Sequence, residues 1–436
     1  MENNTKQQGN IIAIITMMFL FAMISFVTNL AAPIGVIWKN VFQGTGSENM
    51  IGMLGNAMNF LAYLFMGIPA GKLLTKIGYK NTALTGIATG FVGVLIQFIS
   101  GKFGADVSGF AVYLFGAFIS GFAVCILNTV VNPMLNLLGG GGNRGNQLNL
   151  IGGTLNSLAG TLTPMLVGAL IGTVTATTKM ANVNMVLFIA LGVFATAFVV
   201  LFFIPIVDPE MGKTTSKTVF EHSPWAFRHF VLGAIAIFLY VGIEVGIPNI
   251  ANLFMTGSTE ANGLGIDTTT AGSVVGTYWF LMFIGRLTGG SLGAKFSSKG
   301  MLSFVSLLGL VFVLLAIFIP ETQMVNMPVF KADISFGLAQ VPMSIMFLIL
   351  CGLCTSVMWG GIFNLATEGL GKYTAAASGI FMVMVCGGGI LPAIQGWAAD
   401  AVGYIQSYWV IVLAIAYLLF YALVGSKNVN TDIDVA

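Results

Sequence analysis

The chain alternates long runs of apolar residues with short polar intervals. A helix that crosses the hydrocarbon layer of a membrane needs about 20 apolar residues, and its backbone amides must bond within the helix because lipid offers them no partner. Runs of this length recur along the whole sequence, so the pattern predicts an all-α membrane protein with twelve transmembrane helices. The twelve segments are 11–38, 50–71, 82–100, 109–138, 147–174, 183–205, 229–254, 268–294, 300–320, 341–367, 373–398 and 404–425.

The positions of the few charges add an orientation. Only 7% of the residues are charged and the formal net charge is +2, so we expect the lipid bilayer and no nucleic acid as a partner. With a cytoplasmic N-terminus, 13 of the 17 basic residues fall on the cytoplasmic side, as the positive-inside rule requires. These are Lys6, Lys72, Lys76, Lys80, Arg144, Lys213, Lys217, Arg228, Arg286, Lys295, Lys299, Lys372 and Lys427; the others are Lys39, Lys102, Lys179 and Lys331.

The longest polar interval in mid-chain divides the predicted helices six and six. It predicts an N-terminal six-helix bundle over 1–205, a cytoplasmic linker over 206–228 and a C-terminal six-helix bundle over 229–436, with both termini in the cytoplasm. A repeat supports the division, because the segment 71–80 after the second helix has a looser echo at 289–299 after the eighth. Duplicated halves of this kind are typical of secondary transporters.

Polar side chains inside apolar spans are the best functional candidates, because an unpaired amide in hydrocarbon costs several kcal/mol. An uncharged amide both donates and accepts hydrogen bonds, which suits the hydroxyls of a sugar, and an aromatic ring can cover the apolar face of a sugar ring. Trp359 stands out beside Gly360 and Gly361. The alternative is interhelical hydrogen bonding or packing. The predicted substrate-binding residues are Asn29, Asn128, Asn156, Asn249, Trp359 and Asn364.

Glu244 is the only carboxylate deep within a predicted span, between Gly242 and Gly246. Burial favours the neutral form of a carboxyl group, so a change in water access could load and unload a proton there. We therefore predict that Glu244 couples transport to protons. The alternative is a permanently protonated side chain that bonds a neighbouring helix.

Other classes of function find little support in the sequence. No nucleotide-binding P-loop is present, so ATP-driven transport by this chain is not expected. A membrane enzyme would need clustered ionisable groups, yet His222 and His229 both lie near the linker and Glu244 has no second deep carboxylate beside it. We expect no enzymatic activity, no metal site and no bound cofactor.

Two sets of motifs carry a resemblance to a known family. Gly71, Lys76, Gly78 and Lys80 match the loop between the second and third helices of the major facilitator superfamily, although Thr75 occupies its acidic position. Within that superfamily the chain resembles the fucose, galactose and glucose proton symporters. The stretches that carry the likeness are 128–133 with 148–157, 240–245, 362–371 and 387–392.

The resemblance implies the major facilitator fold, a gating role for the matched loop, and cation-coupled import of a hexose such as glucose, galactose or fucose by alternating access. It also implies a monomer in the bacterial inner membrane, with the proton as the expected coupling ion and sodium as the alternative. Asn128 replaces an acidic residue of that family, which leaves Glu244 as the remaining titratable group. A sodium-coupled or uncoupled carrier of an amino sugar or sialic acid, or a drug exporter, stays open.

Overall fold

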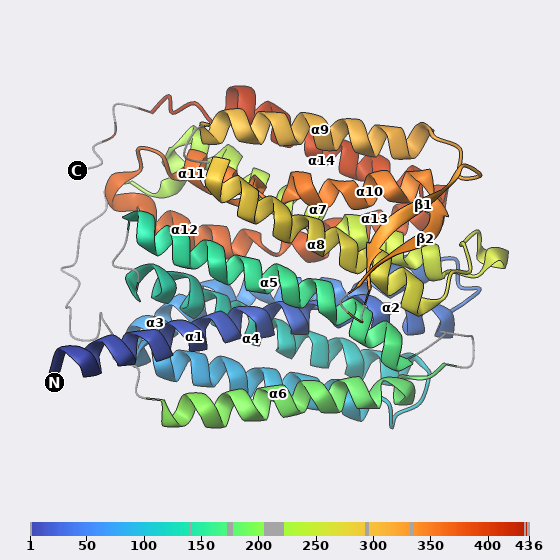
Figure 1. Ribbon diagram of the computed structural model, residues 1–436, viewed down its shortest axis with the longest axis horizontal. Helices are drawn as coiled ribbons and strands as arrows, with labels where there is room; N and C mark the ends of the chain where they lie inside the picture. Colours follow the sequence, from blue (N-terminus) through green and yellow to red (C-terminus); the bar gives the residue numbers. More distant parts are fainter. Residues whose placement is uncertain are drawn as a thin grey trace.

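The computed structural model describes residues 2–138, 142–171, 178–204, 222–292, 296–331, 333, 335–430 and 433, most of them in long helices that run roughly along one axis (Figure 1). In the first half these are α1 Glu2–Asn29, α2 Ala31–Val41, α3 Glu48–Ser100, α4 Val107–Leu138, α5 Gly142–Ile171 and α6 Asn184–Phe203. In the second half they are α7 Arg228–Thr256, α8 Thr268–Leu292, α9 Ser298–Phe318, α10 Met343–Thr355, α11 Met358–Thr367, α12 Thr374–Met384, α13 Gly387–Val402 and α14 Trp409–Phe420, which continues as a π-helix over Tyr421–Gly425.

The described part of the chain contains ten helices that are long and apolar enough to cross a membrane, or eleven if the bent pair α10 and α11 counts as one span. The predicted helices 50–71 and 82–100 both lie in α3, where Gly78 interrupts the helical backbone with φ 79° and ψ 174°. The remaining predicted span corresponds to α8, a helix rich in Thr, Ser and Gly that is not among these ten. The fold is therefore a helical membrane bundle, and the full number of twelve spans stays a prediction.

Three predicted spans are broken in the middle. The first breaks at Leu30 between α1 and α2, and another at Val385 and Cys386 between α12 and α13. The span over 341–367 is bent by 40° where α10 ends and α11 begins, directly before Trp359. Of these three, the α10–α11 pair is the one with a sharp bend; the described spans Ile11–Val41 and Ala376–Val402 each continue across their break.

Proline within an unbroken helix acts differently. Pro248 lacks an amide hydrogen, so the carbonyl of Glu244 four residues earlier has no helical donor. The hydroxyl of Tyr278 on α8 donates to that carbonyl instead, at 3.1 Å. In the same way Asn56 on α3 donates to the carbonyl of Gly388 at 2.9 Å, four residues before Pro392 on α13. Neighbouring helices thus supply the hydrogen bonds that proline removes.

A β-hairpin departs from the all-helical prediction. Strands β1 Met324–Phe330 and β2 Phe336–Pro342 pair antiparallel between α9 and α10. The amide of Phe330 donates to the hydroxyl of Thr277 at 3.0 Å, which fixes the hairpin to α8. Buried and exposed residues alternate over only seven positions per strand, a weak signal beside the long apolar runs around it. The hairpin lies at the opposite end of the molecule from the N-terminus (Figure 1).

Helices of the two halves meet through glycine. Between α3 and α13, a Cβ added at Gly389 would lie 2.5 Å from the carbonyl oxygen of Ala57, closer than real side chains come. Between α5 and α8, a Cβ at Gly272 would lie 2.7 Å from the carbonyl oxygen of Pro164. Small residues are what such close helix contacts require. The predicted domain boundaries stay predictions, because much of the predicted linker 206–228 lies outside the described residues.

Candidate functional site

A charged pair joins three helices in the middle of the bundle. Glu244 on α7 and Arg286 on α8 lie 3.4 Å apart between Oε1 and Nη2, with 14% and 18% of their side chains exposed. The other terminal nitrogen of Arg286, Nη1, donates to the carbonyl of Gly153 and to the hydroxyl of Ser157 on α5, both at 2.9 Å. A single guanidinium therefore connects a carboxylate of the second half to the backbone of the first.

The structure corrects the expectation for Arg286. We placed it with the basic residues of the cytoplasmic side, and this was wrong, because the residue lies within α8 and pairs with a partly buried carboxylate. The sequence did contain the signal. Arg286 falls inside the predicted span 268–294, and a charged residue within a span needs an opposite charge or a carbonyl beside it.

Aromatic residues extend this pair towards α11. Tyr240 lies one helical turn before Glu244 on α7, and its hydroxyl is close enough to Glu244 and Arg286 to interact with both electrostatically. The ring of Trp359 meets the ring of Tyr240 edge to face, with 6.2 Å between the centroids. The predicted residues Glu244 and Trp359 are thus linked through one tyrosine.

Asn29 joins the same region from α1. Its amide donates to the carbonyl and the hydroxyl of Ser25, at 2.9 and 3.2 Å. A Cβ added at Gly160 on α5 would lie 3.4 Å from the amide nitrogen of Asn29 and 3.3 Å from the ring of Trp279 on α8, so the two side chains flank this glycine. Trp279, like Arg286, was not among the predicted site residues.

Helical spacing places these contacts in one continuous strip. Gly153, Ser157 and Gly160 recur at intervals of four and three along α5, and Trp279 and Arg286 are two turns apart on α8, so each set shares one face of its helix. The members, which we call the central cluster, are Asn29, Ser157, Tyr240, Glu244, Trp279, Arg286 and Trp359.

The other predicted substrate residues have different surroundings. Asn128 donates to the hydroxyl of Tyr63 on α3 at 2.6 Å, and Asn156 donates to the carbonyl of Phe21 on α1 at 2.9 Å. Both contacts are interhelical hydrogen bonds, which we expected as the alternative to substrate binding. Asn249 is buried in α7. Asn364 is exposed at the far end of α11, 3.5 Å from the hydroxyl of Ser298 at the start of α9.

The predicted gating loop is a tight turn within α3. Gly78 takes the positive φ there, and Gly71 has open space around it. Lys80 donates to the carbonyls of Phe202 and Ile204 at 2.9 and 2.7 Å, where α6 ends. A lysine at this position stabilises the end of a helix, because the last carbonyls carry partial negative charge. Lys76 is exposed.

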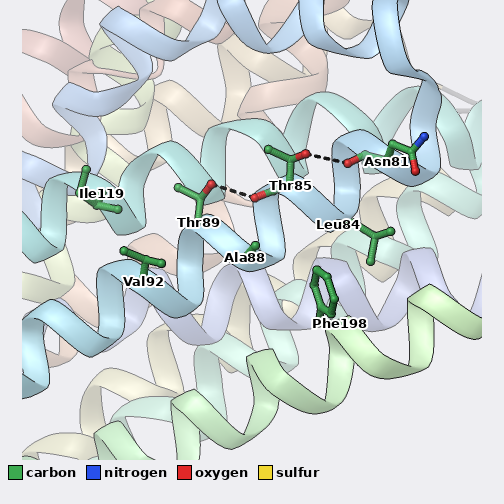
Figure 2. A pocket seen from close by; sticks show the side chains of 8 residues that line it. All are labelled: Asn81, Leu84, Thr85, Ala88, Thr89, Val92, Ile119 and Phe198. Carbon is green, nitrogen blue, oxygen red and sulfur yellow. Dashed lines mark hydrogen bonds between the residues drawn. The ribbon is translucent and has the colours of Figure 1, made fainter.

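Two surface hollows lie away from the central cluster. One of about 590 Å³ is formed by α3, α4 and α6, and the hydroxyls of Thr85 and Thr89 on its wall bond carbonyls of their own helix (Figure 2). The other, of about 400 Å³, lies between α8 and the hairpin. Neither is lined by a predicted site residue.

Comparison with known proteins decides the family. A family model described as the Major Facilitator Superfamily matches residues 13–392. The chain belongs to the Major Facilitator Superfamily. A role in transport and not in catalysis follows from this membership, and the resemblance seen in the sequence is confirmed.

Curated members of the superfamily match the chain over nearly its full length. A protein named glucose/galactose transporter from Brucella abortus is 31% identical, with 98% of each chain covered. A putative glucose/galactose transporter from Helicobacter pylori is 29% identical, with 97% of this chain and 99% of the relative covered. The L-fucose-proton symporter of Escherichia coli is 23% identical, with 95% of this chain and 92% of the symporter covered.

Among solved structures, the chain resembles the superfamily transporter FucP in its outward conformation. The TM-score is 0.66 at 19% identity, with 96% of this chain and 100% of the FucP chain covered. Likeness at this identity supports the helical superfamily fold.

Proposed function

We propose that this protein is a sugar-proton symporter that imports a hexose, such as glucose, galactose or fucose, by alternating access. The observation that carries the proposal is the 31% identity over 98% of the chain to a protein named glucose/galactose transporter. A partly buried acid-base pair at the contact of the two halves supports it, because such a pair can bind a proton and respond to the movement of either half.

The central cluster is the proposed sugar site. Asn29 supplies an amide that can both donate and accept, and Trp279 lies close enough to present a ring face to the same ligand. Trp359 offers a second ring at the break between α10 and α11. Sugars present apolar ring faces edged by hydroxyls, so amides beside indole rings suit them. Asn128, Asn156, Asn249 and Asn364 stay proposals of lower rank, because the described contacts do not join them to this cluster.

Glu244 is the proposed proton carrier. As a carboxylate it pairs with Arg286, and a proton on Glu244 removes that attraction. The guanidinium then keeps only its bonds to Gly153 and Ser157 on α5, so the protonation state of Glu244 changes how α7 and α8 are held against α5. In this way protonation and the relative position of the two halves become linked. Sodium at the same carboxylate is the competing choice of ion.

The remaining features of the proposal concern the whole chain. They are twelve spans arranged as bundles over 1–205 and 229–436 with a cytoplasmic linker over 206–228, both termini in the cytoplasm, a gating role for Gly71, Lys76, Gly78 and Lys80, and a monomer in the bacterial inner membrane that needs no cofactor. Positive-inside asymmetry supports the orientation, although Arg286 no longer counts towards it.

Glu244→Gln tests the coupling in proteoliposomes. The amide keeps the size of the side chain but cannot lose a proton, so uphill uptake driven by a proton gradient should fall at least a hundredfold. Exchange of internal for external labelled glucose should persist, because it needs no net proton movement. Glu368→Gln is the control, since Glu368 is exposed at the end of α11. Undiminished uphill uptake in Glu244→Gln would remove this residue from the coupling role. Uphill uptake by the unaltered protein under a sodium gradient alone would make sodium, and not the proton, the coupling ion.

A further inference from the structure

One helix of the bundle obtains its N-terminal cap from the opposite half. The first amides of a helix lack partners within it, and a side-chain oxygen of the preceding residue normally accepts from the second or third of them. Ser47 precedes α3 but its side chain makes no such bond. The carboxylate of Asp400, near the end of α13, accepts from the amides of Asn49 and Met50 instead, at 2.8 and 2.9 Å.

Other helix starts show what the usual arrangement is. Asp106 accepts from the amides of Ser108 and Gly109, at 2.9 and 3.0 Å, at the start of α4. Asp267 accepts from the amide of Thr270, at 2.9 Å, at the start of α8. These two aspartates cap the helix that they directly precede. Asp400 performs the same task across about 350 residues of sequence.

A lysine of the first half makes the converse contact, with the C-terminal end of a helix in the second half. Lys39, near the end of α2 in the first half, is only 4% exposed. Its amine donates to the carbonyl of Leu253 in the last turn of α7, at 3.1 Å, and to the hydroxyl of Tyr404 just after α13. The carbonyl of Leu253 also accepts from the amide of Gly257 at 3.0 Å, so Lys39 adds a second bond to it. A cation is stabilising at a helix C-terminus, where the last carbonyls carry partial negative charge.

The two charges thus form a reciprocal arrangement. An anion from the second half caps the N-terminus of a first-half helix, and a cation from the first half caps the C-terminus of a second-half helix. Both lie at the end of the bundle where α2 passes into α3, which the positive-inside rule assigns to the outside of the cell. Asp400 and Glu48 are also near enough to Lys39 to attract it. Every one of these contacts except that with Glu48 breaks if the halves separate at this end.

We propose that Lys39 and Asp400 are the residues that hold the outer mouth of the transporter shut, and that their helix-capping bonds set the balance between its closed and open states. This balance does not depend on which solute is carried or on which ion drives it, so the proposal stands apart from the sugar and proton assignments.

Distances between spin labels on the two halves test the proposal. Gln43, between α2 and α3, and Glu260, between α7 and α8, are both exposed at this end. The four buried cysteines are first replaced. Gln43→Cys and Glu260→Cys then place one spin label on each half, and pulsed electron paramagnetic resonance in proteoliposomes measures the distance between the labels. Opening of the mouth appears as a second population at longer distance.

Asp400→Ala and Lys39→Met should each raise the ratio of open to closed molecules about fivefold, the typical effect of losing a cap or a charge at a helix end. Asp400→Asn should give a smaller rise, because asparagine can still cap but carries no charge. Lys39→Arg should keep the ratio near that of the unaltered chain.

Asp267→Ala is the matched control, since it also removes an aspartate cap at this end but breaks no contact between the halves. Its ratio should stay within twofold of the unaltered chain. Each variant is first shown to be monodisperse, and if Lys39→Met does not fold, the two Asp400 variants decide. Unchanged distances in the folded Asp400 variants, or an equal shift in Asp267→Ala, would overturn the proposal.

Discussion

Charged side chains join the two halves of this transporter at two places, and they do so in different ways. In the central cluster a charge meets a charge, with Glu244 and Arg286 at 3.4 Å and Arg286 bonded onward to α5. At the outer end Lys39 and Asp400 each meet the end of a helix. Protonation of Glu244 removes its attraction to Arg286, whereas the bonds from Arg286 to α5 remain. In the second arrangement each ionisable side chain meets a helix end, whose partial charge is fixed, so each of these contacts has one partner that titrates and one that does not.

The largest expected effect comes from removing the shared member of the central cluster. Arg286→Met leaves Glu244 as a partly buried carboxylate without its partner, and breaking a fully buried pair in this way costs about 3–5 kcal/mol, which is the upper limit here. We expect a fall of more than a hundredfold in uphill sugar uptake by proteoliposomes, together with a lower temperature of thermal unfolding. Adding Glu244→Gln should restore the unfolding temperature, because a neutral amide needs no counter-charge, but it should not restore uphill uptake. Normal uptake by Arg286→Met would show that the Glu244–Arg286 pair has no part in coupling, and so does not differ in this respect from the contacts of Lys39 and Asp400.

Much of this architecture was predictable from the apolar runs. The predicted segment 229–254 corresponds to α7 over Arg228–Thr256, and 300–320 corresponds to α9 over Ser298–Phe318. A single long apolar run between polar loops forms one spanning helix, because lipid offers its backbone no other hydrogen-bond partners. The hairpin was missed since two seven-residue strands give no comparable signal. Pro248 leaves α7 unbroken, and the hydroxyl of Tyr278 replaces the hydrogen bond that this proline removes.

The site was predictable only in part. Glu244 stood out because a lone carboxylate in an apolar span is rare, and the structure places it in contact with a charged partner. The amides gave a weaker signal, since a pattern along one helix does not say which neighbour it faces, and Asn128 and Asn156 bond adjacent helices. The capping by Asp400 could not be foreseen, because it depends on how two helices more than 300 residues apart pack.

Close packing at glycine also joins the two halves. An added methyl group tests the contribution of this packing without changing any charge. Gly389→Ala would place a Cβ 2.5 Å from the carbonyl of Ala57, so α13 and α3 must move apart. Overpacking of this kind costs about 1–3 kcal/mol, which should raise the ratio of open to closed molecules fivefold or more in the spin-label experiment. Gly379→Ala on α12 is the control, because its Cβ meets open space. Equal behaviour of the two variants would mean that charge alone holds the halves together.

The smallest expected effect tests where the central cluster ends. Asn29 flanks Gly160 together with Trp279, whereas Asn364 is exposed beside Ser298 at the start of α9. Asn29→Ala should raise the KM for glucose or galactose about fivefold, because a lost neutral hydrogen bond costs about 1 kcal/mol. Asn364→Ala should change it less than twofold, because solvent already satisfies an exposed amide. Initial rates of labelled uptake over a range of sugar concentrations measure both. A rise in KM for Asn364→Ala that equals the rise for Asn29→Ala would extend the sugar site to the end of α11, so that the solute would contact the region between α9 and α11 on its way through the protein.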